Sequence, residues 1–285
     1  MAGTTALTVS VGVLASTFYT NLFSAPVLVG AGDIATCPNT GDEDTAALLE
    51  DIEGTVFTTG DNAYPDGTDA DFENCYEPSW GRHKPRTYPS PGNHEYHTPG
   101  ASDYFDYFGV AAGDPGEGYY SYNQGAWHMV VLNSNIAVEP GSAQHEWLRA
   151  DLASNTAACT LAYWHHPLFS SGHHGNQTKM KPIWEALYAA DVDVVVNGHD
   201  HDYERFALQD PSGEADLARG IREFVVGTGG SGLRPFETIQ PNSEVRSADT
   251  HGILKLSLNP TSYDWEFIPV SGGGTFTDSG SGSCH

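Results

Sequence analysis

The sequence predicts an α/β sandwich with two central β-sheets, and three features of the chain point to that fold class. Short apolar runs rich in valine recur along the 285 residues, and each ends in a polar loop. Helix-like segments lie between several of these runs, as in strand–helix units that build a sheet buried on both faces. Hydrophobic residues make up 39% of the chain, which is enough to bury a large core and excludes a disordered acidic protein.

Six of the apolar runs are predicted to be buried strands. They are short, rich in valine and bounded by glycine or aspartate, a pattern typical of strands covered on both faces. Their residues are 27–32, 55–59, 127–133, 160–164, 192–197 and 223–227. Helical patterns between them predict helices over residues 44–53, 143–153 and 181–190, with Ser142 as the N-cap of the second.

The last part of the chain has a different character. Residues 253–258 and 263–268 are predicted to form an antiparallel pair of strands joined at Asn259 and Pro260. Residues 272–283 are rich in glycine and serine and are predicted to be a low-complexity tail. Since no internal repeat precedes that tail, we expect residues 27–285 to form one domain.

Residues 1–26 are predicted to be an N-terminal extension outside this domain. Residues 1–20 are apolar enough for the core of a signal peptide, but no Lys or Arg precedes them. Residues 8–13 alternate like a strand, so the extension is the trimmed end of a precursor, a strand of a preceding module or a processed export signal. It is too short and too polar to span a membrane.

The four cysteines, Cys37, Cys75, Cys159 and Cys284, predict two disulfides and a location outside the cytosol. They form no CxxC pair, which disfavours a structural zinc site. Three pairings are possible. We favour Cys37–Cys75 and Cys159–Cys284, because the second pair would tie the tail to a core strand. Four unpaired buried thiols are the alternative. The expected location is secreted, extracellular or periplasmic.

The charge balance excludes several classes of protein. Twelve Lys and Arg residues stand against 37 Asp and Glu residues, which gives a formal net charge of −25. A chain this acidic has no basic face for a phosphate backbone, so we expect no nucleic-acid scaffold function. Attraction to an anionic membrane surface is disfavoured for the same reason.

Polar side chains follow five apolar segments at the points where these segments end. Ligands gather at the carboxyl ends of strands in α/β sheets, so we expect these side chains to share one edge. Carboxylates, an amide oxygen and imidazoles together are typical of a metal site, and this number of them indicates two ions. The residues concerned are Asp33, Asp61, Asn93, His165, His199 and His201.

The order of the motifs GD, GDNAY, GNHE, HHP and GHDH over residues 27–205 closely resembles the calcineurin-like metallophosphoesterases. The second motif contains a tyrosine, Tyr64, and in this it resembles the purple acid phosphatase branch of that family. The first motif departs from the usual Asp-x-Gly or Asp-x-His, because it reads Asp33-Ile34-Ala35. The resemblance implies a four-layer αββα sandwich with two central mixed β-sheets, and a catalytic domain over residues 27–285 that hydrolyses phosphate esters with two metal ions.

The resemblance also implies which residues hold the metals. One ion would be bound by Asp33, Asp61, Tyr64 and His201, and the other by Asp61, Asn93, His165 and His199, with Asp61 bridging. A phenolate is a hard anionic donor, so Fe(III) is expected at the Tyr64 site, and Zn(II), Mn(II) or Fe(II) at the second. A metal-bound hydroxide would then attack phosphorus directly, without a covalent phosphoenzyme.

Histidines that handle protons and phosphate are implied in the same way. His94 is expected to donate a proton to the leaving group, with Glu95 orienting its ring. His173 and His174 are expected to clamp the phosphate or to protonate the leaving group. His166 stands where the phosphatase branch usually has a small residue, and it receives no role.

The predicted function is the metal-dependent hydrolysis of phosphate monoesters. A phosphodiesterase that acts on cyclic nucleotides or other diesters with the same metals is the alternative within this family. An alternative of another class is a catalytically silent module that binds metal or phosphate. The expected partner is a small phosphate-ester substrate.

Overall fold

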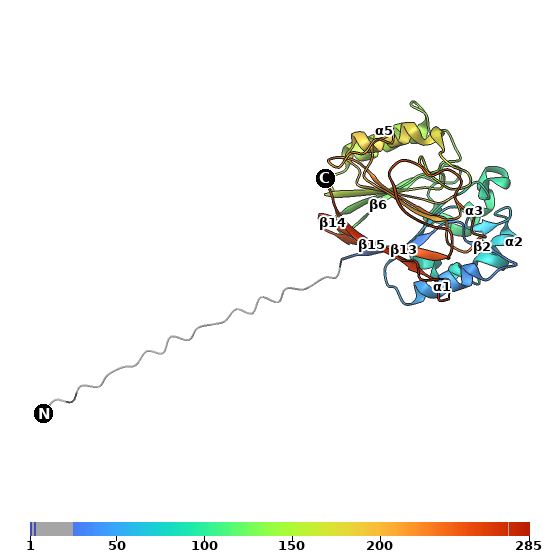
Figure 1. The fold of residues 1–285 in the computed structure, drawn as a ribbon, viewed down its shortest axis with the longest axis horizontal. Coiled ribbons are helices and arrows are strands. Elements are labelled where there is room, and N and C mark those ends of the chain that lie inside the picture. The colour runs from blue at the N-terminus through green and yellow to red at the C-terminus, as the bar shows by residue number, and fades with distance from the viewer. Residues whose placement is uncertain (2, 4–24, 273) are drawn as a thin grey trace.

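The computed structural model describes residues 1, 3, 25–272 and 274–285, which form two β-sheets packed face to face with helices outside them (Figure 1). The predicted sandwich with two central mixed sheets is therefore confirmed. The predicted extension at residues 1–26 lies almost entirely outside the described residues, and its nature stays a prediction.

The first sheet contains three parallel strands from the start of the chain and three antiparallel strands from its end. Within the described residues its strands are β1 (Val27–Ala31), β3 (Thr55–Thr59), β5 (Thr87–Ser90), β13 (Gly252–Asn259), β14 (Ser262–Pro269) and β15 (Asp278–Ser283). Their order across the sheet is β15-β14-β13-β1-β3-β5.

The second sheet is built around four parallel strands with antiparallel strands toward its edges. Its strands are β6 (Tyr120–Gln124), β7 (Trp127–Val131), β8 (Cys159–Tyr163), β9 (Val194–Asn197), β10 (Tyr203–Phe206), β11 (Arg222–Val226) and β12 (Ser243–Ser247). Their order is β12-β10-β11-β9-β8-β7-β6. Two short strands, β2 (Ala35–Thr36) and β4 (Ala63–Tyr64), pair in parallel beside the first sheet.

The helices cover the outer faces of the two sheets, with α1 and α5 on opposite sides of the molecule (Figure 1). The α-helices are α1 (Gly41–Glu50), α2 (Asp69–Asp71), α3 (Ser102–Phe108), α4 (Ala143–Ser154) and α5 (Lys181–Ala189). Shorter helical turns lie at Phe72–Tyr76, Trp80–Arg86, Glu95–His97, Pro99–Ala101, Gly109–Ala112 and Thr178–Met180. The Ser142 hydroxyl accepts the His145 N–H at 3.3 Å, which confirms the predicted N-cap of α4.

The second sheet is apolar on both faces, as its valine-rich strands predict. Val194 and Val196 of β9 face the core between the sheets, whereas Val195 packs with Trp184 and Leu187 of α5 on the outer side. This arrangement follows from the period of two residues along a strand, which sends alternate side chains to opposite faces.

The second half of the glycine- and serine-rich tail forms strand β15. Gly280 and Gly282 belong to this strand, which pairs with residues 262–267 of β14. The indole of Trp265 lies directly over Gly280, where a Cβ atom would come within 2.3 Å of the ring. An aromatic ring from the neighbouring strand therefore fills the space above the glycine, a long-range contact that composition alone does not reveal.

Both predicted disulfides, Cys37–Cys75 and Cys159–Cys284, are present. Cys159 opens strand β8 and Cys284 follows strand β15, so the second bond ties the end of the chain to the second sheet. No helix in the described part of the chain combines the length and the apolar character that crossing a bilayer requires.

Opening either disulfide is expected to destabilise the protein, and the longer loop should matter more. The bonds close loops of 38 and 125 residues in sequence separation. The loop-entropy relation then gives about 4 kcal/mol for Cys37–Cys75 and about 5 kcal/mol for Cys159–Cys284. Urea unfolding of the two double Ser variants, with mass spectrometry to verify the remaining bond, measures both values. Unfolding free energies equal to that of the intact protein would contradict the expectation.

Candidate metal centre

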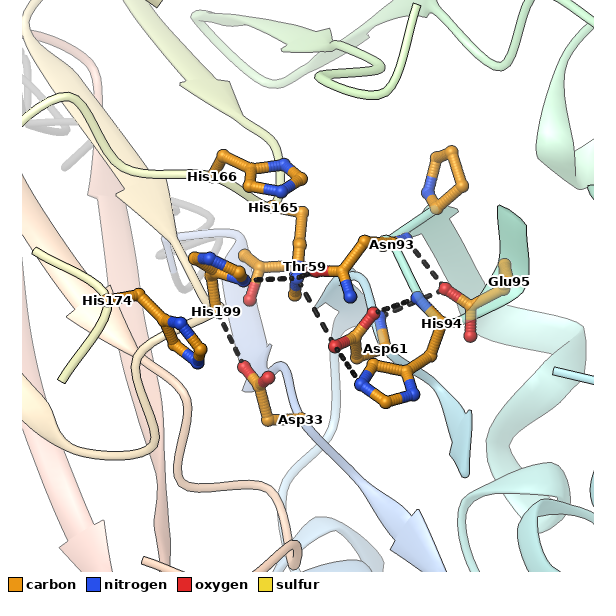
Figure 2. A network of polar contacts seen from close by, with 12 residues as sticks. Asp33, Thr59, Asp61, Asn93, His94, Glu95, His165, His166, His174 and His199 are labelled. Atoms are coloured by element: carbon orange, nitrogen blue, oxygen red, sulfur yellow. Dashed lines mark hydrogen bonds and ion pairs between the residues drawn. The ribbon is translucent and has the colours of Figure 1, made fainter. Parts of the chain in front are cut away.

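The seven predicted metal ligands lie together where strands of both sheets end. Asp33 follows β1, Asp61 follows β3, and Asn93 follows β5 after a short loop. His165 follows β8, and His199 and His201 follow β9, while Tyr64 lies in β4. Parallel strands end at the same edge of a sheet, so two facing sheets bring these side chains into one site. Figure 2 shows five of them: Asp33, Asp61, Asn93, His165 and His199.

Four of the side chains form a first group of donor atoms around the Tyr64 hydroxyl. Tyr64 Oη lies 2.9 Å from Asp33 Oδ1, 3.1 Å from Asp61 Oδ2 and 3.1 Å from His201 Nε2. His201 Nε2 in turn lies 3.3 Å from Asp33 Oδ1. These are the four residues expected to hold the first ion.

A second group gathers around His165. Its Nε2 lies 3.0 Å from Asn93 Oδ1, 3.1 Å from His199 Nδ1 and 3.3 Å from Asp61 Oδ2 (Figure 2). Asp61 Oδ2 therefore belongs to both groups, as a bridging carboxylate would. His165 and Asp61 are completely or almost completely buried, so water cannot screen this contact.

The hydrogen atoms on two of the imidazoles can be assigned, and they test whether the site fits metal ions. His165 Nδ1 lies 2.8 Å from the carbonyl of Thr59, and His201 Nδ1 lies 2.8 Å from that of Gly232. A carbonyl only accepts, so each Nδ1 donates, and each ring in its neutral form turns the lone pair of Nε2 toward the carboxylates. A backbone partner of this kind is typical of metal-binding histidines.

Lone pairs that face one another at such distances repel unless positive charge lies between them. Atoms bound at about 2.1 Å around one metal ion are themselves separated by roughly 3 Å, which is the spacing within both groups. The donor set thus fits two cations that share Asp61.

The pKa values of Tyr64 and His165 also indicate that the site favours positive charge. Burial, together with the carboxylates of Asp33 and Asp61, raises the pKa of the Tyr64 phenol well above its ordinary range. Burial lowers the pKa of His165, but the charge and hydrogen bond of Asp61 outweigh it and raise this pKa to about 9. In the absence of an ion, a proton on His165 takes its place. A phenolate at Tyr64 requires a strongly charged cation.

Three of the candidate ligands have a left-handed backbone, which is uncommon outside glycine. The φ angles are 58° at Asp33, 49° at Asp61 and 72° at His199. Such residues cost about 1–3 kcal/mol each and persist where surrounding contacts hold them. Here Asp33 Oδ2 accepts the backbone N–H of His199 at 2.8 Å, and Asp61 Oδ1 accepts that of His94 at 2.9 Å.

Glu95 does not orient the His94 ring, contrary to the expectation from the sequence. Its carboxylate is fully buried and accepts four backbone N–H groups. Oε2 accepts those of Asp61 at 3.0 Å and Gly92 at 2.6 Å, and Oε1 accepts those of Asn62 at 2.8 Å and Ala63 at 3.3 Å. Glu95 therefore joins the loop that carries Asp61 to the loop that carries Asn93.

His94 lies beside Asp61 and Tyr64 and is partly exposed. Its Nδ1 donates to the carbonyl of Pro65, and its Nε2 lies 3.8 Å from Asp61 Oδ2. The side chain is 27% exposed, and its ring lies 4.4 Å from that of Tyr64. The expected proton donor thus has one nitrogen held by the backbone and the other directed to the centre.

Only one histidine of the predicted pair lies at the centre. The His174 ring stacks on that of His199 with 4.2 Å between centroids (Figure 2). His173 instead directs Nδ1 to Glu237 Oε1 at 2.6 Å and is half exposed. Adjacent residues in this loop point in different directions, which the sequence cannot reveal.

His166, which received no role from the sequence, is buried against the second group. Its ring lies 4.8 Å from that of His165 and 4.4 Å from that of His199. Nδ1 lies 2.7 Å from the Ser134 hydroxyl. Burial, followed by the charges of His165 and Lys179, lowers the pKa of His166 to about 2, so this ring is neutral.

Removing the Glu95 carboxylate is expected to destabilise the protein and to weaken metal binding. Each buried N–H left without a partner costs about 1–3 kcal/mol. Glu95→Gln keeps an acceptor for one pair of N–H groups, whereas Glu95→Ala keeps none. We expect Glu95→Gln to lower the unfolding free energy by about 3 kcal/mol and Glu95→Ala by more.

Urea unfolding of the metal-free protein and zinc titration check this expectation. Glu146→Gln, at an exposed position of α4, is the matched control and should leave both measurements unchanged. Wild-type stability of Glu95→Ala would contradict the role of Glu95 as a link between the two loops.

Several known proteins resemble this chain in sequence. The model of the calcineurin-like phosphoesterase family matches residues 28–203. Purple acid phosphatase 15 of Arabidopsis thaliana is 31% identical over 211 residues, which cover 61% of this chain and 40% of that protein. Probable inactive purple acid phosphatase 1 of the same plant is 22% identical over 260 residues, covering 75% of this chain and 41% of that protein.

The fold is also similar to that of solved structures. A purple acid phosphatase from yellow lupin (Lupinus luteus) seeds matches 91% of this chain and 54% of its own length, with a TM-score of 0.77 at 19% identity. The chain thus spans about half or less of the length of these relatives. Since the family model covers all five motifs, the chain belongs to the calcineurin-like phosphoesterase family, and purple acid phosphatases are among the members that it resembles.

Proposed function

We propose that this protein is a metal-dependent phosphatase that hydrolyses phosphate monoesters. One observation carries the proposal: two groups of donor atoms share Asp61 Oδ2, at spacings that fit two neighbouring cations. Membership of the phosphoesterase family supports the same reaction. The two disulfides favour a location outside the cytosol.

The metals proposed for the two groups follow from their donors. Asp33, Asp61, Tyr64 and His201 would hold Fe(III), because a phenolate and carboxylates are hard anionic donors. Asp61, Asn93, His165 and His199 would hold Zn(II), Mn(II) or Fe(II). Bound there, two ions supply positive charge to the phosphoryl oxygens and make a water more acidic.

His94 is proposed to protonate the leaving group. Its Nδ1–H is held by the Pro65 carbonyl, so the ring keeps one orientation. The second nitrogen, Nε2, faces the centre beside Asp61. A protonated Nε2 can donate to the ester oxygen as the bond to phosphorus breaks. His174 forms the wall on the His199 side, and His173 lies farther out, paired with Glu237.

Tyr64→Phe tests the iron site directly. Among the described residues the Tyr64 hydroxyl hydrogen-bonds only with Asp33, Asp61 and His201, so its loss should remove one ligand and leave the fold intact. We expect the visible absorption band of an iron–phenolate pair in the wild type, its loss in the variant, and a fall in kcat/KM of at least about 100-fold. Tyr76→Phe is the matched control, since the buried Tyr76 hydroxyl has no partner among the described residues.

A comparison of two esters tests the reaction. The protein loaded with iron and zinc is expected to hydrolyse p-nitrophenyl phosphate faster than bis(p-nitrophenyl) phosphate. Faster hydrolysis of the diester would establish the phosphodiesterase instead, and a metal-loaded protein that hydrolyses neither ester would be the silent binding module.

Metal analysis tests the Fe(III) assignment separately. A colourless protein with stoichiometric zinc or manganese would contradict it.

A further inference from the structure

Within the described residues Arg234 is one of four arginines without an acidic partner, together with Arg86, Arg149 and Arg246, and of these it is the one that adjoins the candidate metal centre. Four other arginines, Arg82, Arg205, Arg219 and Arg222, lie within 3.1 Å of carboxylates. No carboxylate of the described residues lies within 4.0 Å of the Arg234 guanidinium. Its charge is therefore available to something other than the protein's own acids.

Two contacts hold Arg234 beside the candidate metal centre. Its backbone N–H donates to the carbonyl of His201 at 3.0 Å. Its guanidinium Nη1 lies 2.8 Å from Nε2 of His174, whose ring stacks on His199. Arg234 thus adjoins one ligand of the first group through its backbone, and one ligand of the second group through the His174 ring.

The hydrogen bond between Arg234 and His174 shows which of the two side chains carries the positive charge. A guanidinium carries only donors, so Nη1–H donates and His174 Nε2 accepts. A ring that accepts at Nε2 is neutral, and the charge therefore belongs to Arg234. Within the described residues the Nε and Nη2 groups of Arg234 have no hydrogen-bond partner, so they can donate to a ligand.

We propose that Arg234 binds a non-bridging oxygen of the substrate's phosphoryl group and selects phosphate monoesters over diesters. This inference rests on the proposed phosphatase function and names the residue that determines its substrate class. Guanidinium groups bind phosphate oxygens through charged, often paired hydrogen bonds. A monoester is largely dianionic at neutral pH, whereas a diester has one charge and an ester group in place of one free oxygen. His174 is the positioning residue that holds the guanidinium.

The test compares Arg234→Gln and Arg234→Lys with the wild type. Arg149→Gln is the matched control, because Arg149 is exposed on α4 and its loss changes the net charge equally. Metal analysis and thermal unfolding verify that each variant binds its metals and folds. Calorimetry with inorganic phosphate on the metal-loaded proteins gives a readout that does not depend on turnover.

Loss of a hydrogen bond to a charged group is expected to weaken phosphate binding by Arg234→Gln about 10- to 100-fold. The kcat/KM for p-nitrophenyl phosphate should fall by a similar factor, and that for bis(p-nitrophenyl) phosphate much less. Arg234→Lys should recover part of the loss, since it restores the charge but not the planar geometry.

Unchanged phosphate affinity in Arg234→Gln, or equal losses for the two esters, would overturn the assignment. If the wild type hydrolyses neither ester, the proposed function fails, and phosphate calorimetry still decides the assignment of Arg234. A metal-loaded wild type that binds no phosphate would overturn it as well.

Discussion

The structure depends on one electrostatic constraint: lone pairs of oxygen and nitrogen converge on Asp61 in a buried site, and only positive charge can hold them there. The Nδ1–H groups of His165 and His201 are committed to backbone carbonyls, so neither ring can turn its lone pair away. At low dielectric this repulsion is stronger than in water. Metal ions bound at these positions would therefore stabilise the folded state.

The backbone around the site is strained at three of the candidate metal ligands. Asp33, Asp61 and His199 have left-handed φ angles. The carboxylate of Glu95 compensates by satisfying four buried N–H groups across two loops. A Cβ at Gly92 would lie 2.1 Å from Asp61 Oδ1, so only glycine permits this close approach. The rigid arrangement of the site is thus a property of the loops as much as of the ligands.

The net charge of −25 has to be reconciled with a site for a negatively charged phosphate ester. An acidic protein repels phosphate, so a phosphate site on it must create its own positive potential. Under the proposed function two metal ions would do so at the centre, and Arg234 would add a cation that pairs with no carboxylate of the described residues. The remaining acidic residues contribute to solubility. The charge still argues against nucleic-acid scaffolds, but it does not exclude a small phosphorylated substrate.

The sequence by itself determined the two-sheet sandwich, the disulfide framework and the set of residues that the structure gathers at the centre. Local patterns give much of this, because Asp33, Asp61, His165 and His199 each follow closely a strand that an apolar run predicts. Tyr64 was added by the resemblance of the motifs to a known family. Tertiary structure alone decided the partners of Glu95, the separate directions of His173 and His174, and the place of Arg234. It also decided strand β15, whose glycines pack beneath Trp265. These features depend on contacts between segments far apart in the chain, and no local pattern encodes which of those segments meet.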